Sequence, residues 1–188
     1  MLQRYGLSLE ILDGNFSSIP KDGPLILVAN HPFGILDGLI LGYIMSKSRP
    51  DFKILANQVF CGSDDLNDII LPISFDETKE ASKMNIATRL SALNFLDNGG
   101  AIGVFPGGTV STSRRPFGVP MDPGWRSFTA KMITRSDAQV VPIFFEGHNS
   151  RLFQVASHIH YNLRMGLLIK EFKSKVGNPV KIAIGNPL

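Results

Sequence analysis

Residues 25–38 read LILVANHPFGILDG, an apolar run followed at once by a polar turn. The run Leu25–Ala29 has the continuous apolar character of a strand that is covered on both faces of a sheet. His31 and Asp37 follow this strand, with Gly34 between them. Open α/β sheets place their active sites at such strand ends, and a histidine beside a carboxylate can act as a general base with an orienting partner. The stretch therefore predicts an α/β fold and a candidate catalytic pair.

Apolar runs alternate with helix-like segments along the rest of the chain. Strands are expected at residues 25–29, 52–56, 69–73, 101–105, 140–145 and 180–184, with an edge strand at 7–12. Helices are expected at 37–45, 79–96, 125–134 and near 165–172. This alternation predicts a single α/β domain over residues 1–188, three layers thick, with a mostly parallel central sheet flanked by helices.

The formal net charge of +3 over 188 residues is too small to indicate nucleic-acid binding. Basic side chains do gather in one part of the sequence, namely Arg114, Arg115, Arg126, Lys131 and Arg135. Such a group is typical either of a solvated face or of a surface that meets an anionic membrane or an acidic substrate.

Cys61 is the only cysteine, which excludes an internal disulfide and a cysteine-based zinc site and fits a reducing, cytoplasmic compartment. We expect no metal. The first residues do not have the pattern of a signal peptide, and no run of about 18 apolar residues could span a bilayer. Membrane contact is therefore expected to be peripheral, or made by segments outside this chain.

Two further strand ends carry polar or glycine-rich turns. Residues 105–111 read FPGGTVS, and consecutive glycines such as Gly107 and Gly108 allow backbone N–H groups to converge on an oxyanion. Residues 141–153 read VPIFFEGHNSRLF. From this turn we expect Glu146, Asn149 and Arg151 to bind substrate in the same cleft, although ordinary surface polarity is the alternative for each.

These three motifs, in this order, resemble those of the glycerophospholipid acyltransferase superfamily, whose members carry Asn-His-x(4)-Asp, Phe-Pro-Glu-Gly-Thr-Arg-Ser and a Val-Pro-Ile/Val strand. The resemblance covers most of the chain. It implies that His31 is the general base on an acceptor hydroxyl and that Asp37 orients it. It implies an acyl thioester of CoA or acyl carrier protein as co-substrate, a lipid acceptor and no cofactor. The turn of Gly107, Gly108 and Thr109 would then lie at the acceptor or oxyanion site.

The chain departs from that family pattern in three places. The spacing from His31 to Asp37 is one residue longer, which on a continuous helix would turn the acid by about 100°. We therefore predict that Gly34 forms a turn and that the helix begins near Ile35–Leu36. Gly107 and Val110 stand where the family has Glu and Arg, and the stretch 73–78, which matches an arginine-bearing motif, is acidic.

The missing arginines argue against a phosphate-bearing acceptor, because the arginine fork suits phosphate. The alternative is that Arg89, Arg114 or Arg115 takes their place. The spacing variant is most similar to the bacterial ornithine-lipid O-acyltransferases and hemolysin-like acyltransferases. This resemblance implies a lyso-aminolipid acceptor and a location peripheral to the inner face of the cell membrane. An apolar cleft must hold the acyl chain, and Phe33, Ile35, Phe60 and Phe117 are candidates for its lining, with core packing as the alternative.

The sequence thus predicts an O-acyltransferase in which His31 removes the proton of an acceptor hydroxyl. One alternative is a hydrolase of acyl thioesters or esters that uses the same base with water. The other is a non-catalytic module that binds lipid or acyl carrier protein.

Overall fold

The computed structural model describes residues 6–62 and 64–188, which form a seven-stranded sheet, a small two-stranded sheet and the helices around them. The strands are β1 (Ser8–Asp13), β2 (Leu25–Ala29), β3 (Phe52–Asn57), β4 (Ile70–Ile73), β5 (Ala101–Val104), β6 (Thr112–Ser113), β7 (Pro120–Met121), β8 (Gln139–Phe145) and β9 (Pro179–Ile184). The α-helices are α1 (Ile35–Ser48), α2 (Asp64–Asn67), α3 (Lys79–Asp97), α4 (Ser127–Thr134), α5 (Arg151–Ile159) and α6 (Tyr161–Lys175). Two short 3-10 helices are η2 (Phe16–Ser18) and η3 (Gln58–Phe60).

The large sheet has the strand order β1-β9-β8-β2-β5-β3-β4. All neighbouring strands are parallel except β8 and β9, so a mostly parallel sheet is confirmed. In the centre, Val28 of β2 pairs with Val104 of β5 and with Pro142 of β8. The carboxyl ends of these three strands are therefore nearly level, and the three motif-bearing turns leave the sheet at the same edge.

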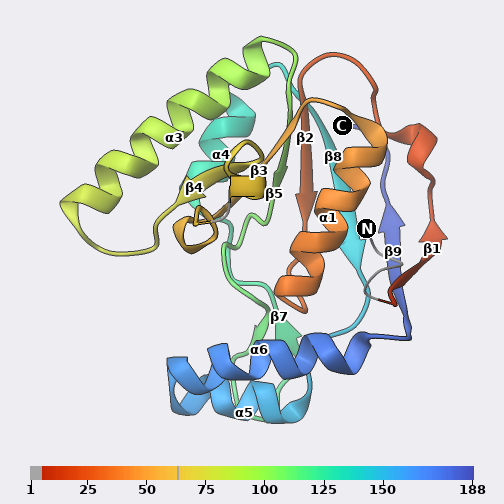
Figure 1. Cartoon of the computed structure of the whole chain (residues 1–188), viewed down its shortest axis with the longest axis vertical. Coiled ribbons are helices and arrows are strands. Elements are labelled where there is room, and N and C mark those ends of the chain that lie inside the picture. Colours follow the sequence, from red (N-terminus) through yellow and green to blue (C-terminus); the bar gives the residue numbers. More distant parts are fainter. Residues whose placement is uncertain (1–5, 63) are drawn as a thin grey trace.

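Helices cover both faces of this sheet, as Figure 1 shows. Helix α1 packs on one face, where Leu36, Ile40 and Ile44 join side chains of β2, β8 and β9 in a buried cluster. Helices α3 and α4 pack on the other face, where Leu96 and Met132 meet β2, β3 and β5. The predicted three-layer α/β architecture is thus confirmed.

The seven expected strands of the large sheet form within one or two residues of their predicted bounds, and β1 lies at the edge as predicted. The helix expected near 165–172 is longer at both ends and forms α6. Helices α2 and α5, the two 3-10 helices and the β6–β7 hairpin were not predicted. Ser150 begins α5 by accepting a hydrogen bond from the Phe153 N–H, while its own N–H and hydroxyl donate to Glu171 of α6. A tertiary contact thus supports this helix start, and local sequence does not reveal it.

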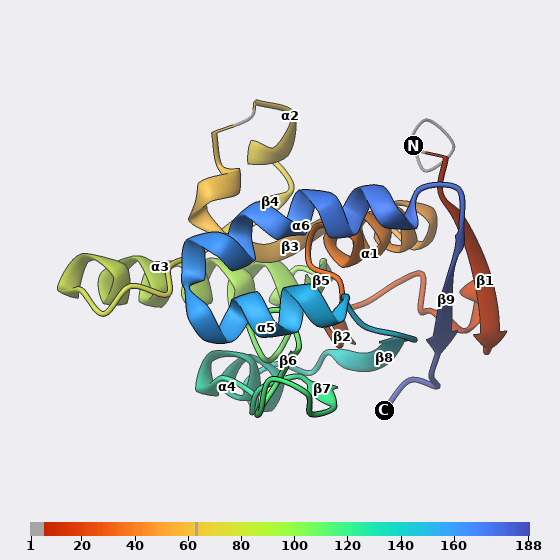
Figure 2. The ribbon, with the colours of Figure 1, turned by 90° about the horizontal axis from the view of Figure 1, so that it is seen from below.

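Helices α5 and α6 form a hairpin across the carboxyl ends of the central strands (Figures 1 and 2). Phe153 of α5 and Leu168 of α6 pack against Val110 and Ile35, the first residue of α1. The β6–β7 hairpin lies beside α5 (Figure 2). These elements surround the strand end that carries His31.

Candidate active site

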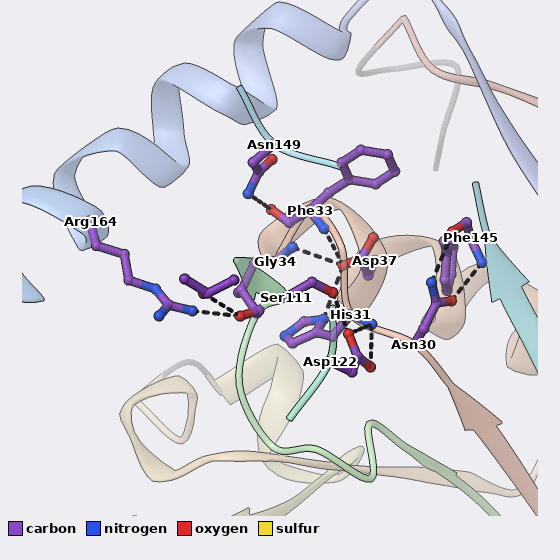
Figure 3. Close-up of polar contacts among 12 residues, drawn as sticks. Asn30, His31, Phe33, Gly34, Asp37, Ser111, Asp122, Phe145, Asn149 and Arg164 are labelled. Atoms are coloured by element: carbon purple, nitrogen blue, oxygen red, sulfur yellow. Dashed lines mark hydrogen bonds and ion pairs between the residues drawn. The ribbon is translucent and has the colours of Figure 1, made fainter. Parts of the chain in front are cut away.

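His31 lies two residues beyond the end of β2, and its ring lies close to the carboxylate of Asp37 (Figure 3). Its Nδ1 is 3.0 Å from Oδ2 of Asp37. The ring stacks on Phe105, which follows β5, with 4.0 Å between centroids. The His31 side chain keeps 16% of its surface exposed, whereas that of Asp37 has none. Because Nδ1 lies within 3.0 Å of the Asp37 carboxylate, Nε2 is the ring nitrogen left to exchange a proton with a substrate.

Asp37 is held by the backbone of the turn that precedes its own helix. Its Oδ2 accepts hydrogen bonds from the N–H groups of Phe33 and Gly34, at 2.7 and 2.8 Å. Burial raises the pKa of the Asp37 carboxyl, while the contacts with His31 and with the two N–H groups act in the opposite direction. The same oxygen therefore closes the turn and orients the histidine.

Gly34 provides the turn that the longer spacing requires. Its φ is +89°, a backbone conformation that favours glycine, and α1 begins at the next residue, Ile35. A Cβ added at Gly34 would lie 2.9 Å from Leu168 and 3.1 Å from Val110. The extra residue is thus absorbed before the helix, as predicted, and His31 meets Asp37.

Asp122 is a part of the site that sequence reasoning missed. Its carboxylate accepts the backbone N–H of His31, at 3.1 and 3.2 Å to its two oxygens, and the hydroxyl of Ser111. The Ser111 N–H in turn donates to the His31 carbonyl at 2.8 Å. The long segment after β5 therefore bonds to both the N–H and the carbonyl of His31 (Figure 3). That segment is rich in glycine, proline and serine, and no local pattern distinguishes Asp122 within it.

Asn30, the first residue of the Asn-His motif, joins two neighbouring strand ends. Its amide donates to the Phe145 carbonyl at 2.9 Å and accepts the Phe145 N–H at 2.7 Å. This pair of bonds ties the end of β2 to the end of β8 and so supports the backbone position of His31 (Figure 3).

The glycine-rich turn adjoins this site, although one of its donors is already occupied. Gly108 has a φ of +74°, and its N–H donates to the Phe105 carbonyl at 2.9 Å, so it closes the turn. A Cβ at Gly107 would meet Pro123 at 3.0 Å, so this position packs closely against the segment that carries Asp122. Thr109 lines a cavity beside Asp122. The substrate-binding roles of all three residues remain predictions.

The three polar residues expected from the turn after β8 have different positions. Asn149 is buried, and its amide donates to the Phe33 carbonyl at 3.4 Å, which joins it to the His31–Asp37 turn. Arg151 instead donates to the carbonyls of Phe117 and Gly118, and Glu146 is exposed. Only Asn149 is therefore brought to the histidine turn by a hydrogen bond.

The four apolar residues expected to line an acyl cleft also differ in their burial and position. Phe33 is buried and lies under the Lys175 ammonium, and Ile35 packs beside Val110 and Phe153. Phe60 and Phe117 are 46% and 78% exposed. The first two thus pack beside the histidine turn, whereas the other two point into solvent.

The described residues contain no group of three or more His, Cys, Asp and Glu side chains arranged to hold a metal ion. The chemistry that the site itself offers is proton transfer: a neutral imidazole, held by a carboxylate, can accept a proton from a hydroxyl group.

Comparison with known proteins places these observations in a family. Residues 9–188 match the family model described as acyltransferase. The chain is 28% identical over 193 aligned positions to lyso-glycine lipid O-acyltransferases of Phocaeicola vulgatus and Bacteroides thetaiotaomicron. These alignments cover 96% of the chain, which spans only 66% and 68% of the lengths of those two relatives.

A solved structure has a similar fold. It is the crystal structure of the 1-acyl-sn-glycerophosphate (LPA) acyltransferase PlsC from Thermotoga maritima, with a TM-score of 0.54 and 17% sequence identity. The match covers the whole of this chain and 67% of that one. At this identity the likeness concerns the fold alone.

Proposed function

This chain belongs to the acyltransferase family, and from that premise we propose that it transfers a fatty acyl group from an acyl thioester to the hydroxyl of a lipid acceptor. The observation that carries the proposal is the 3.0 Å approach of His31 Nδ1 to Asp37 Oδ2 at the end of a central strand. The names of two relatives, both lipid O-acyltransferases, support it.

In the proposed reaction His31 acts first as base and then as acid. Its Nε2 takes the proton of the acceptor hydroxyl while the hydroxyl oxygen attacks the thioester carbonyl carbon. When the tetrahedral intermediate collapses, the C–S bond breaks and an ester forms. The leaving thiolate takes the proton back from His31 and departs as the free thiol of CoA or acyl carrier protein. Asp37 keeps the Nδ1–H tautomer and stabilises the transient imidazolium.

We further propose that the acceptor is a lyso-aminolipid. The relatives are named for a lyso-glycine lipid, which supports an amino-acid headgroup. The apolar Val110 and the acidic stretch at 73–78 also favour an acceptor without a phosphate. The ornithine and glycine headgroups remain alternatives within this class.

Contact with a membrane surface is also part of the proposal, because a lipid acceptor must reach His31. The described residues include no helix that is both long and apolar enough to cross a bilayer. Exposed apolar side chains do occur on the α5–α6 hairpin, which lies across the carboxyl ends of the central strands, and on the segment from 117 to 125. This apolar surface consists of Leu152, Ile159, Leu163, Met165, Ile169, Phe117, Val119, Met121 and Trp125.

Two features of the apolar surface support its contact with lipid. The Arg151 guanidinium bonds to the carbonyls of Phe117 and Gly118, so the two parts adjoin. A groove of about 440 Å³ between α5 and α6 is lined by Leu152, Ile159, Leu163 and neighbouring residues. We propose peripheral contact with the inner face of the cell membrane through this surface.

The test of the enzymatic proposal is product analysis with defined donors and acceptors. The protein is incubated with labelled acyl-CoA or acyl carrier protein thioester and with either an N-(β-hydroxyacyl)glycine or lysophosphatidic acid. We expect the aminolipid ester and one free thiol per ester formed. Preferential acylation of lysophosphatidic acid would contradict the acceptor class. Free fatty acid formed at a rate independent of acceptor would indicate a hydrolase, and binding without turnover would indicate a non-catalytic module.

A further inference from the structure

A cavity of about 310 Å³ lies on the side of the site formed by the segment after β5 and by α6. Its lining includes the polar residues Thr112, Arg114, Asp122 and Arg164, together with the apolar Val110. Two arginines from separate parts of the chain thus share one cavity.

Hydrogen bonds connect the lining of this cavity to the backbone of His31. Asp122 accepts the His31 N–H, and the N–H of Ser111, the residue after Val110, donates to the His31 carbonyl. The Val110 carbonyl accepts a hydrogen bond of 2.7 Å from Arg164. Arg164 is therefore linked to His31 through the adjacent residues Val110 and Ser111. Figure 3 labels Arg164, Ser111 and His31. The lining of the cavity is thus joined by hydrogen bonds to the backbone of the proposed base.

The charges around the cavity suit a single negative charge. Arg114 and Arg164 are positive and Asp122 is negative, so the lining carries a net charge of +1 from two arginines and one aspartate. Asp122 is turned toward Ser111 and the His31 N–H. The Arg164 guanidinium is held by the Val110 carbonyl and lies 5.4 Å from the centroid of the Phe153 ring. A carboxylate carries a single negative charge and two coplanar oxygens, which a guanidinium group can bind with two parallel hydrogen bonds.

We propose that this cavity binds the carboxylate of the acceptor headgroup through Arg114 and Arg164. The inference rests on the proposed function and extends it by naming the residues that select the headgroup. An amino acid acylated on its nitrogen keeps its carboxylate, and a hydroxyl on the acyl chain lies only a few bonds away. A carboxylate held at the arginines would therefore position that hydroxyl at His31, and the guanidinium fork suits a carboxylate geometrically.

The test measures binding without turnover, using N-decanoylglycine and its uncharged amide, N-decanoylglycinamide, below their micellar concentrations. Isothermal titration is carried out on the whole chain and on the variants Arg114→Gln, Arg164→Gln and Arg115→Gln. Arg115 is the matched control, because it is exposed on the same segment and does not line the cavity. Thermal melting checks that each variant is folded, which matters most for Arg164 because of its bond to Val110.

We expect the acid to bind the unmodified protein about tenfold more tightly than the amide, as charged hydrogen bonds predict. Arg114→Gln and Arg164→Gln should each remove most of this preference, and Arg115→Gln should retain it. Equal binding of acid and amide, no binding of either, or equal effects of Arg114→Gln and Arg115→Gln would overturn the assignment. Tighter binding of lysophosphatidic acid than of the acid would overturn it in favour of a phosphate. Acid-selective binding without acyl transfer would instead retain this site and refute the proposed function.

Discussion

One oxygen atom of Asp37, Oδ2, contacts both the backbone of the turn and the imidazole of His31. That oxygen accepts two backbone N–H groups of the turn and lies 3.0 Å from His31. A substitution at this position should therefore affect both the turn and the orientation of the imidazole. The two effects can be separated by measuring stability and activity on the same variant.

The Asp37→Asn variant should change how stability depends on pH. Burial raises the pKa of Asp37 in the folded state above its unfolded value of 3.8. Protonation of Asp37 therefore stabilises the folded state, and this contribution is fully present below pH 3.8. That contribution is lost as the pH rises through the folded pKa. The unfolding free energy of the original protein, compared with that of Asp37→Asn, should therefore fall as the pH rises above about 4. Urea unfolding of both proteins across this range measures the difference.

A difference that grows with pH would contradict this expectation. It would mean that the His31 contact and the two N–H bonds outweigh burial and lower the pKa of Asp37.

Single residues also show what the sequence could predict of the site. His31 and Asp37 stand in one short stretch with a glycine between them, so their pairing follows from local spacing. Asp122 lies 91 residues from His31 and reaches it only through the course of the long segment after β5. Tertiary contacts determine that course, which is why local sequence patterns do not identify Asp122.

At the scale of elements, the turn before α1 determines whether the pair can form. Gly34 has a positive φ and faces Leu168 and Val110, whereas Gly38 lies within α1 and a Cβ there would meet nothing within 4 Å. The two glycines, four positions apart, therefore provide a matched comparison of the same substitution.

Gly34→Ala should lower the unfolding free energy by about 1–3 kcal/mol, because alanine is strained at this φ and its Cβ would crowd α6. It should also lower the rate of acyl transfer, since Asp37 moves with the turn. Gly38→Ala should leave stability unchanged or raise it by about 0.5–1 kcal/mol, because glycine is unfavourable inside a helix. Chemical unfolding of both variants gives the comparison, and equal effects would show that the turn has no special conformational requirement.

Element prediction succeeded where a buried apolar run defines the strand and failed where a contact defines the helix. Most strands of the large sheet follow from continuous apolar runs, and β1, whose sequence is more polar, was expected as an edge strand. The nine residues of α5 begin in a polar turn, and Glu171, distant in sequence, bonds to the Ser150 cap. The β6–β7 hairpin has only two residues in each strand, too few for a period-two pattern to be visible.

At the scale of the whole molecule, the α5–α6 hairpin lies beside the carboxyl end of the sheet (Figure 1). Several apolar side chains of this hairpin are exposed. Helix α3 lies on another side of the molecule (Figure 1) and also carries an exposed apolar residue, Leu90. The sequence predicted peripheral contact but not its position, because the apolar residues concerned come from segments that only the fold brings together.

Ile159→Glu should weaken binding to vesicles that contain anionic lipid, whereas Leu90→Glu should not. The two side chains are similarly exposed, at 67% and 61%, so the cost of the new charge to folding should be similar. Loss of one apolar side chain from the lipid interface should reduce the partition coefficient about tenfold. Vesicle co-sedimentation measures this. Equal losses for the two variants, or none for Ile159→Glu, would contradict docking through the apolar surface.

The central claim is that His31 is the base in acyl transfer to a lipid hydroxyl, and the most direct measurement is the rate of ester formation by His31→Ala. The acceptor is N-(β-hydroxyacyl)glycine, and His158→Ala, which changes an exposed histidine of α5, is the control. The account predicts that His31→Ala forms the ester about 10²–10⁴-fold more slowly while it stays folded, and that His158→Ala keeps the original rate. Ester formation by folded His31→Ala at the original rate would contradict it.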